Sequence, residues 1–368
     1  MKKQWLKLKD WQRVLALFLI WRAGLVVVAW RGRFLLPLKM TFYDGGWGWA
    51  NFDGVHYLTI AERGYGLFQQ AFFPLYPLLI RGLERVVSDY LLAGMLIANS
   101  CVLAALFYFY RLVEMDFGGK TAWRVLAGWL MFPTSFFLGA VYTESLFIFL
   151  IIFSFYQARK GRWLWAGLAG GVASATRIVG IVLLPALLVE IYQQTGFRIS
   201  WKKYWPIILV PAGLFFYMFY LNKTVGDPWY FVHVQENFAA GRTGGKIILL
   251  YQVFWRYLKM IATTRADILY LSVWNELIIG ILFLTLSVWA FKRLRLSYAV
   301  FMAISYLIPT LSGTFLSLPR FCLTMFPGFI LLALMLEKLG QKRYLCLVPS
   351  AMLLTVFTIL FTRGYWVA

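Results

Sequence analysis

The sequence predicts an all-α polytopic membrane protein, and three observations support this fold class. Hydrophobic residues make up 61% of the chain and charged residues only 14%, whereas a soluble protein carries about 25% charged residues. Apolar runs long enough to cross about 30 Å of hydrocarbon recur along the whole chain. The basic residues lie in short clusters between these runs rather than on one polar domain. We therefore expect residues 1–368 to form a single integral membrane domain.

The composition also excludes other classes of protein. The formal charge of +21 is distributed as the positive-inside rule and anionic lipid headgroups require, so we expect membrane lipids as partners and no nucleic acid. Cys101, Cys322 and Cys346 all fall in apolar runs, which argues against a disulfide framework. His56 and His233 are the two histidines of the chain, so no histidine cluster is available for zinc. We expect no metal and no cofactor.

Hydropathy and the basic clusters together predict about eleven transmembrane helices, with the N-terminus in the cytoplasm and the C-terminus outside. In order, the spans are expected at 14–30, 90–113, 122–141 and 143–157, as two short helices within 163–190, at 204–221, on either side of the basic cluster 292–295, from Arg320 to Lys338, and up to about residue 361. Every short loop assigned to the cytoplasm then contains Lys or Arg, and two long loops, 31–89 and 222–267, lie on the outer face. This arrangement predicts a multi-pass protein of the cell membrane with a large first extracytoplasmic loop.

The stretch from Asn51 to Pro77, NFDGVHYLTIAERGYGLFQQAFFPLYP, is the part of the first outer loop that predicts a working site. It is too polar to cross a membrane, and the prolines near its end prevent one continuous helix. Asp53 is the first candidate, and Gly54 is expected to leave room beside its carboxylate. A carboxylate near a membrane surface can accept a proton from a substrate hydroxyl, but aspartate is also favoured as the N-cap of a helix. Both interpretations of Asp53 fit the sequence.

Further candidate side chains follow Asp53 within roughly three helical turns, namely His56, Tyr57, Glu62 and Arg63. His56 either orients Asp53 or contacts a substrate, although a lone histidine on an aromatic helix is more often simply packed. Glu62 and Arg63 either pair with each other and with solvent or take part in binding. Together with Tyr57, these residues are the candidate substrate-binding residues of the first loop.

Later polar residues stand at the expected outer ends of helices. Glu144 begins a span and either faces the cavity of the first-loop carboxylate or caps its helix. Arg177 ends the predicted break at 174–177, and broken helices usually line a cavity. Arg177 and Arg320 either hold a phosphate through two parallel hydrogen bonds or anchor at lipid headgroups. His233 lies among aromatic residues of the second loop, which suit a sugar, a lipid chain or an interfacial belt.

Together these residues favour transfer of a sugar from a lipid phosphate. An acceptor hydroxyl needs a base, and a departing lipid phosphate needs cations as negative charge develops on it. Asp53 supplies the base, while Arg177 and Arg320 supply the cations. A transporter or lipid flippase is the alternative, but such proteins place ionisable groups near the bilayer midplane and often contain inverted repeats. A non-catalytic scaffold for envelope assembly is a third interpretation.

Several segments resemble the PIG-V family of mannosyltransferases, including its prokaryotic members. They are NFDGVHYLTIAERGY, AFFPLYPLLIR, FPTSFFLGAVYTESLF, SATRIVGIVLLPALL and PRFCLTMFPGFILLA, in this order along the chain. The resemblance implies a GT-C type bundle with an extracytoplasmic active site. It also implies inverting transfer, typically of mannose, from a polyprenyl- or dolichyl-phosphate donor to a glycan, lipid or protein acceptor. Asp53 matches the family's first-loop aspartate, taken as the catalytic base; Glu144, Arg177 and Arg320 match later polar positions, whereas His56 stands where many relatives have another residue.

Overall fold

Helices are the regular elements of the part of the chain that the computed structural model describes, which is residues 8–41, 48–196, 200–237, 242–243, 245–264 and 268–367. The α-helices are α2 (Asp10–Leu35), α3 (Asp53–Arg63), α4 (Leu75–Val87), α5 (Tyr90–Leu130), α6 (Glu144–Arg159), α7 (Trp163–Ser174), α8 (Leu183–Thr195), α9 (Trp201–Tyr204), α10 (Ala212–Thr224), α11 (Tyr230–His233), α12 (Leu250–Thr263), α13 (Ile268–Arg293), α14 (Leu296–Thr310), α15 (Leu318–Phe321), α16 (Phe326–Lys338) and α17 (Tyr344–Thr362). Short 3₁₀ helices are η1 (Gln69–Ala71), η2 (Ser135–Gly139), η3 (Ile178–Val182), η4 (Trp205–Leu209), η5 (Val234–Asn237), η6 (Cys322–Thr324) and η7 (Gly340–Arg343). The predicted all-α class is confirmed for these residues.

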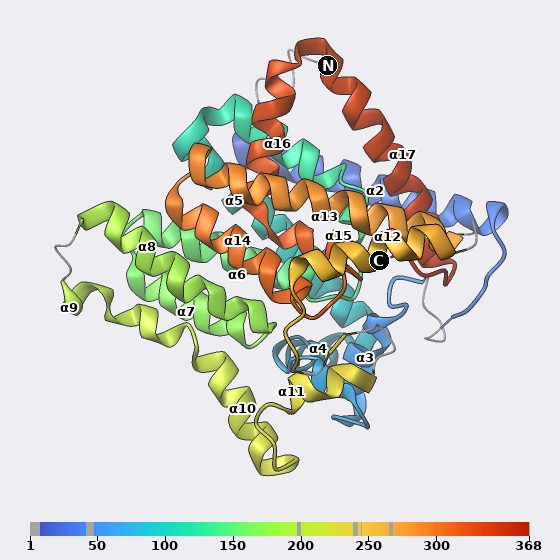
Figure 1. Ribbon diagram of the computed structural model, residues 1–368, viewed down its shortest axis with the longest axis horizontal. Helices are drawn as coiled ribbons and strands as arrows, with labels where there is room; N and C mark the ends of the chain where they lie inside the picture. Colours follow the sequence, from blue (N-terminus) through green and yellow to red (C-terminus); the bar gives the residue numbers. More distant parts are fainter. Residues whose placement is uncertain are drawn as a thin grey trace.

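The interior helix of the bundle is α6, which is apolar and buried on nearly all sides. A helix that is apolar all round belongs in a protein interior or in lipid, and here the neighbours of α6 are other helices. α5 and α7 pack along it, α4 and α16 pack on α5, and α14 contacts both α8 and α13 (Figure 1). α6 therefore fixes the position of the residue at each of its two ends.

Glycines let α7 approach the segment around α10 closely. A Cβ at Gly167 would lie 2.0 Å from the carbonyl oxygen of Pro206, and one at Gly213 would lie 2.2 Å from that of Gly171. Small residues at such contacts allow helices in membranes to pack backbone against backbone. The contact holds the end of α7, and the break before Arg177, against the helix that leads into the second loop.

In the described part of the chain, six helices are long and apolar enough to cross a membrane, or seven if the bent pair 318–324 and 326–338 is one span. The multi-pass prediction is supported, but the total of about eleven spans is not confirmed. The spans expected at 90–113 and 122–141 are joined in α5, which has non-helical backbone at Gly118 and ends at Leu130. Every residue from 132 to 148 is buried, so this stretch is apolar because it packs inside the protein.

The predicted break at 174–177 is confirmed. α7 ends at Ser174, and η3 begins only at Ile178. A second break separates α15 and η6 from α16, where the two pieces meet at 87°. Both breaks bring an arginine, Arg177 in the first and Arg320 in α15, to the same side of α6.

Ion pairs gather several polar segments at the far end of α6. Nη2 of Arg159 lies 2.6 Å from Oδ1 of Asp116, and Nη2 of Arg295 lies 2.9 Å from Oε1 of Glu190. Glu190 is fully buried and also accepts a hydrogen bond from Oγ of Ser297. We call these five residues the Glu190 cluster. It joins turns that the sequence assigns to the cytoplasm.

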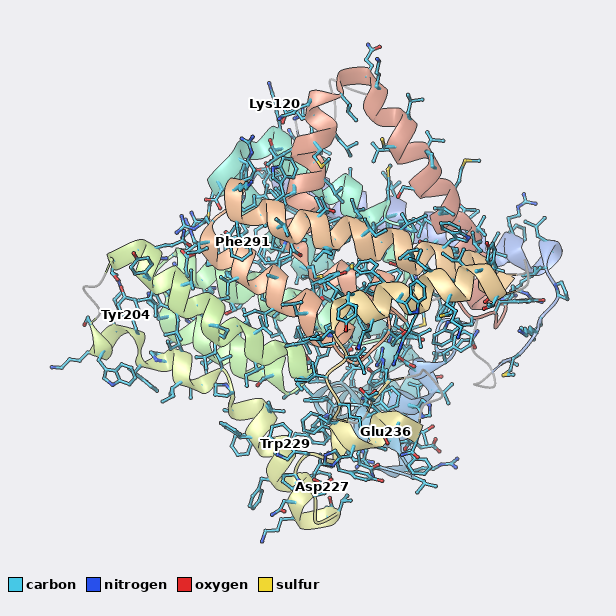
Figure 2. The ribbon with its side chains drawn as sticks, in the orientation of Figure 1. Lys120, Tyr204, Asp227, Trp229, Glu236 and Phe291 are labelled. Carbon is cyan, nitrogen blue, oxygen red and sulfur yellow. The ribbon has the colours of Figure 1, made fainter. Side chains whose placement is uncertain are left out.

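The residues of the two expected faces lie at opposite sides of the molecule. Lys120, from an expected cytoplasmic turn, is far from Asp227 and Trp229 of the second loop (Figure 2). α6 itself runs from Glu144 to Arg159, a rise of roughly 22 Å at 1.5 Å per residue. The chain therefore has one basic, ion-paired end and one end that carries both long loops.

Candidate active site

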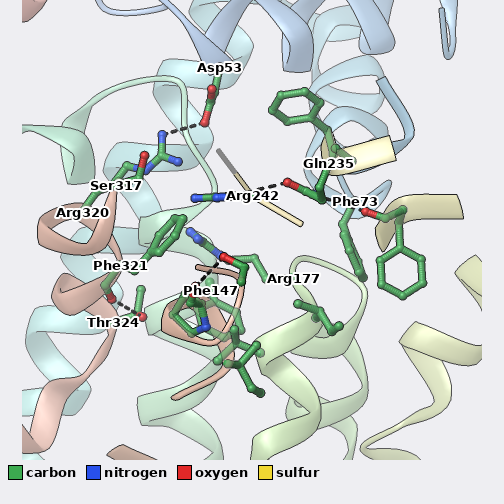
Figure 3. Close-up of a pocket in the computed structure, with 18 of the residues that line it drawn as sticks. Asp53, Phe73, Phe147, Arg177, Gln235, Arg242, Ser317, Arg320, Phe321 and Thr324 are labelled. Atoms are coloured by element: carbon green, nitrogen blue, oxygen red, sulfur yellow. Dashed lines mark hydrogen bonds and ion pairs between the residues drawn. The ribbon is translucent and has the colours of Figure 1, made fainter. Parts of the chain in front are cut away.

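Asp53 is the first residue of α3, and its carboxylate faces an arginine rather than capping its own helix. The N-cap of α3 is Phe52, and no side chain caps that end. Oδ2 of Asp53 instead accepts a hydrogen bond of 2.6 Å from Nη1 of Arg320 (Figure 3). The helix-cap interpretation of Asp53 is therefore wrong.

The backbone just before Asp53 is strained and held by the C-terminal segment. Phe52 has a φ of 58°, which is costly for a residue with a large side chain. Its ring packs against Phe361 and Trp366, with centroid distances of 6.0 and 5.2 Å. Nδ2 of Asn51 donates to the carbonyl oxygen of Phe361 at 2.9 Å. These contacts fix the turn that presents the carboxylate.

Gly54 lies against the buried segment that precedes α6. A Cβ at this position would lie 3.2 Å from the carbonyl oxygen of Val141. The hydroxyl of Tyr142 also donates to the carbonyl oxygen of Asn51 at 2.8 Å. The glycine thus lets α3 approach the buried segment before α6, while the room it leaves beside the Asp53 carboxylate stays a prediction.

Four charged side chains from four separate segments form a continuous chain, which we call the Asp53–Arg177 chain. Nη1 of Arg320 contacts Asp53 at 2.6 Å, and its Nε lies 3.2 Å from Oε1 of Glu144. Nη1 of Arg177 donates to the same Oε1 at 2.6 Å. Only 1% of the Glu144 side chain is exposed. A carboxylate buried so completely requires a compensating charge, and it draws both arginines to the site.

A cavity of about 660 Å³ lies beside this chain, which is within the usual size of small-molecule sites. Its lining includes Asp53, Tyr57, Arg177, Arg242, Arg320 and Phe321, together with apolar side chains. The cavity therefore combines a carboxylate, three guanidinium groups and apolar walls. Such a lining suits an anionic ligand that also has an apolar part.

Arg242 is a cavity residue that the sequence analysis did not single out. It donates from Nη1 to Oε1 of Gln235 at 3.3 Å and from Nη2 to the carbonyl oxygen of Leu316 at 3.2 Å. Burial, followed by the nearby positive charge of Arg320, lowers its pKa to about 10. The sequence held one signal that could have identified Arg242: it is an arginine in an expected outer loop, whereas the positive-inside rule accounts for arginines in cytoplasmic loops.

The ion pair sets the protonation state of Asp53. Burial alone would raise the pKa of this carboxyl, but attraction and a hydrogen bond from Arg320 outweigh burial and lower it. Burial also lowers the pKa of His56, against the opposing attraction of Asp53. At neutral pH, Asp53 is therefore a carboxylate and His56 is uncharged.

The remaining predicted residues lie at different distances from the cavity. Tyr57 lines it, and its hydroxyl lies 3.4 Å from Oγ1 of Thr143. His56 stacks on a phenylalanine ring and contacts Gln69, outside the lining. Further predicted residues pair on the surface: Arg63 contacts Glu62 at 3.3 Å, and His233 contacts Asp227 at 2.7 Å. The structure thus brings Asp53, Tyr57, Glu144, Arg177 and Arg320 together, and substrate roles for His56, Glu62, Arg63 and His233 stay predictions.

The segment that carries Asp53, Glu144 and Arg177 matches a known family. The matching family is described as Mannosyltransferase (PIG-V), and the match extends over residues 42–197. The match covers less than half of the chain. The family match confirms the resemblance drawn from the sequence motifs. Arg242 and Arg320 lie outside the matched segment.

The curated relatives that match this chain are named mannosyltransferases. GPI alpha-1,6-mannosyltransferase 2 of Mus musculus is 35% identical over 157 residues, which cover 38% of this chain and 31% of that protein. The Homo sapiens protein of the same name is 29% identical over 207 residues, covering 51% of this chain and 41% of the relative. The matched regions thus span less than half of these relatives.

The fold as a whole is similar to that of a protein with a solved crystal structure. The crystal structure of ArnT from Cupriavidus metallidurans bound to undecaprenyl phosphate superposes with a TM-score of 0.54 at 14% identity. The superposition covers 94% of this chain and 76% of ArnT, and the apo state of ArnT gives a TM-score of 0.53. At this identity the similarity concerns the fold, and it confirms the expected GT-C type helical bundle.

The Glu144 carboxylate is expected to stabilise the site. Glu144→Gln removes the shared counter-ion of Arg177 and Arg320, so we expect the free energy of unfolding to fall by about 3 kcal/mol. Thermal unfolding of the purified protein in detergent measures the change. Glu62→Gln, at an exposed pair, is the matched control, with an expected change below about 1 kcal/mol. Equal unfolding temperatures for the two variants would show that Glu144 does not hold the arginines in place.

Proposed function

We propose that this protein is an inverting glycosyltransferase. It moves a sugar, with mannose the first candidate, from a polyprenyl- or dolichyl-phosphate donor to a hydroxyl of a glycan, lipid or protein acceptor. The observation that carries the proposal is the ionised carboxylate of Asp53, which lines a cavity with three arginines and lies in the family segment. The names of the curated relatives favour mannose, and the undecaprenyl phosphate bound to ArnT favours a polyprenyl carrier.

The proposed reaction is a single displacement with Asp53 as general base. The proton of the acceptor hydroxyl moves to Asp53, and the acceptor oxygen forms a bond to the anomeric carbon. The bond from that carbon to the phosphate oxygen breaks, and its electron pair leaves with polyprenyl phosphate. Because Oδ2 of Asp53 is engaged by Arg320, Oδ1 receives the proton. Binding both substrates in one cavity removes much of the entropic barrier.

We propose that the N-terminus lies in the cytoplasm of a cell-membrane protein and that the cavity opens on the extracytoplasmic face. The turns joined by the Glu190 cluster are rich in Lys and Arg, as the positive-inside rule expects of cytoplasmic loops. Glu144 and Arg159 lie at opposite ends of α6. If the Arg159 end is cytoplasmic, the cavity is on the other side, where a lipid-linked donor reaches it from the bilayer.

The enzyme is favoured over a transporter or lipid flippase. A base and several cations at one cavity meet the needs of transfer from a phosphate, and the related curated proteins are transferases. Transporters place their ionisable groups near the bilayer midplane. The proposed site instead lies at the end of the bundle that carries both long loops.

Asp53→Asn is expected to reduce sugar transfer about 10²–10⁴-fold, because the amide cannot accept the proton of the acceptor. Purified protein, a mannosyl-phosphate polyprenol and membrane glycolipid acceptors provide the assay, with products read by mass spectrometry. Donor binding is expected to persist in the variant. Asp227→Asn, at an exposed surface pair outside the cavity lining, is the control with unchanged transfer. Full activity of Asp53→Asn would remove Asp53 from the mechanism.

Arg320→Gln is expected to move the acid limb of the pH–activity profile to higher pH. With the guanidinium removed, burial dominates and raises the pKa of Asp53, so the base is protonated and lost earlier as the pH falls. A profile of kcat/KM against pH measures the shift. Arg320→Lys keeps the charge and is expected to retain an acid limb close to that of the unmodified protein. An unchanged limb in Arg320→Gln would mean that Arg320 does not control Asp53.

A further inference from the structure

The charged groups around the cavity are not all engaged in ion pairs. Two carboxylates, Asp53 and Glu144, pair with two guanidinium groups, Arg320 and Arg177. The Asp53–Arg177 chain is therefore neutral as a whole. Arg242 has no carboxylate oxygen within 4.0 Å among the residues that the structure describes. Arg242 is thus the cavity guanidinium that no ion pair engages in the described part of the chain, and the carboxylates that attract it, Asp53 and Glu276, act from beyond that distance.

Arg242 is held in place by neutral groups. Its two hydrogen-bond acceptors are the Gln235 side chain and the Leu316 carbonyl, and its buried Nε has no hydrogen-bond partner. Next to it, the backbone nitrogen of Thr243 donates to the carbonyl oxygen of Ser312 at 3.1 Å. A positioned, half-buried cation that no ion pair engages is costly. It becomes favourable when an anion enters the cavity.

The three arginines surround one aromatic ring. The guanidinium carbons of Arg177, Arg242 and Arg320 lie 4.6, 5.5 and 5.1 Å from the ring centroid of Phe321. Figure 3 shows Arg242 and Arg177 near Phe321, with Arg320 reaching toward Asp53. An anion bound by Arg242 would therefore lie close to the base without breaking the Asp53–Arg177 chain.

We propose that Arg242 is the residue that binds the phosphate of the lipid-linked donor, while the Asp53–Arg177 chain orients the base. The inference rests on the proposed function and deepens it. The donor phosphate diester carries one negative charge, and the departing polyprenyl monophosphate carries up to two. Arg242 compensates the charge that develops as the bond to the sugar breaks. Arg242 therefore stabilises bound polyprenyl monophosphate, the product, more than it stabilises the bound donor.

The test measures binding of polyprenyl monophosphate by the full-length protein in detergent, through ligand-induced shifts in thermal unfolding. A ligand that binds only the folded state raises the unfolding temperature. Arg242→Gln is expected to weaken binding about tenfold to 100-fold, the usual effect of losing hydrogen bonds to a charged group. Arg242→Lys keeps the charge and is expected to retain part of the affinity. Without ligand, Arg242→Gln is expected to be at least as stable as the unmodified protein, because the variant removes a half-buried charge that no ion pair engages.

Arg256→Gln is the matched control. Arg256 is exposed on α12, donates to the carbonyl oxygen of Gly313 at 2.9 Å and is outside the cavity lining. Its variant is expected to bind polyprenyl monophosphate normally. Normal binding by Arg242→Gln, or equal losses in both variants, would overturn the proposal.

Two further ligands identify the source of the phosphate. Phosphatidylglycerol and inorganic phosphate are expected to stabilise the protein less than polyprenyl monophosphate does. Equal stabilisation by phosphatidylglycerol, lost in Arg242→Gln, would overturn the assignment in favour of a general lipid-headgroup site. Failure of this inference and failure of the proposed function give different results. Normal ligand binding by Arg242→Gln alongside active unmodified protein refutes only the role of Arg242, whereas absence of transfer from every polyprenyl-phosphate donor refutes the enzyme.

Discussion

The buried carboxylate of Glu144 is the constraint on which the site depends. It lies at the start of the interior helix α6 and contacts both Arg177 and Arg320. A carboxylate without access to water is stable only when cations and hydrogen bonds surround it. Glu144 therefore ties the break after α7 and the short helix α15 to the core of the bundle. Arg320 contacts both Glu144 and Asp53, so the position of Asp53 also depends on Glu144.

Residues with unusual, positive φ angles lie shortly before each partner of the ion pair between Asp53 and Arg320. Phe52 and Ser317, which precede the two partners closely in the chain, have φ values of 58° and 64°. Such conformations persist where the surroundings over-determine them, and they are frequent at functional sites. Here the aromatic contacts of Phe52 and the packing around α15 supply that support. Both charged groups are consequently positioned by buried structure rather than by mobile loops.

The molecule separates two groups of charges by the length of α6. At one end, the Glu190 cluster is compact and satisfied by several arginines and hydroxyl groups. At the other end, the cavity retains Arg242 without a carboxylate partner among the described residues. The first arrangement stabilises the bundle, since its buried charges are compensated. The second fits the negatively charged lipid-phosphate donor that we propose as its ligand.

The sequence by itself determined the membrane class, the break at 174–177, the family resemblance and the choice of Asp53 as the first candidate residue, because each depends on local pattern. Tertiary structure decided the number of spans, since residues 132–148 are equally apolar whether they face lipid or other helices. It also decided the contacts of the site. Arg242 donates a hydrogen bond to Leu316, which lies 74 positions away in the chain. No local sequence motif encodes a contact over that separation. Hydropathy measures how hydrophobic a segment is. The residue that pairs with a charged side chain depends instead on which distant segments pack together.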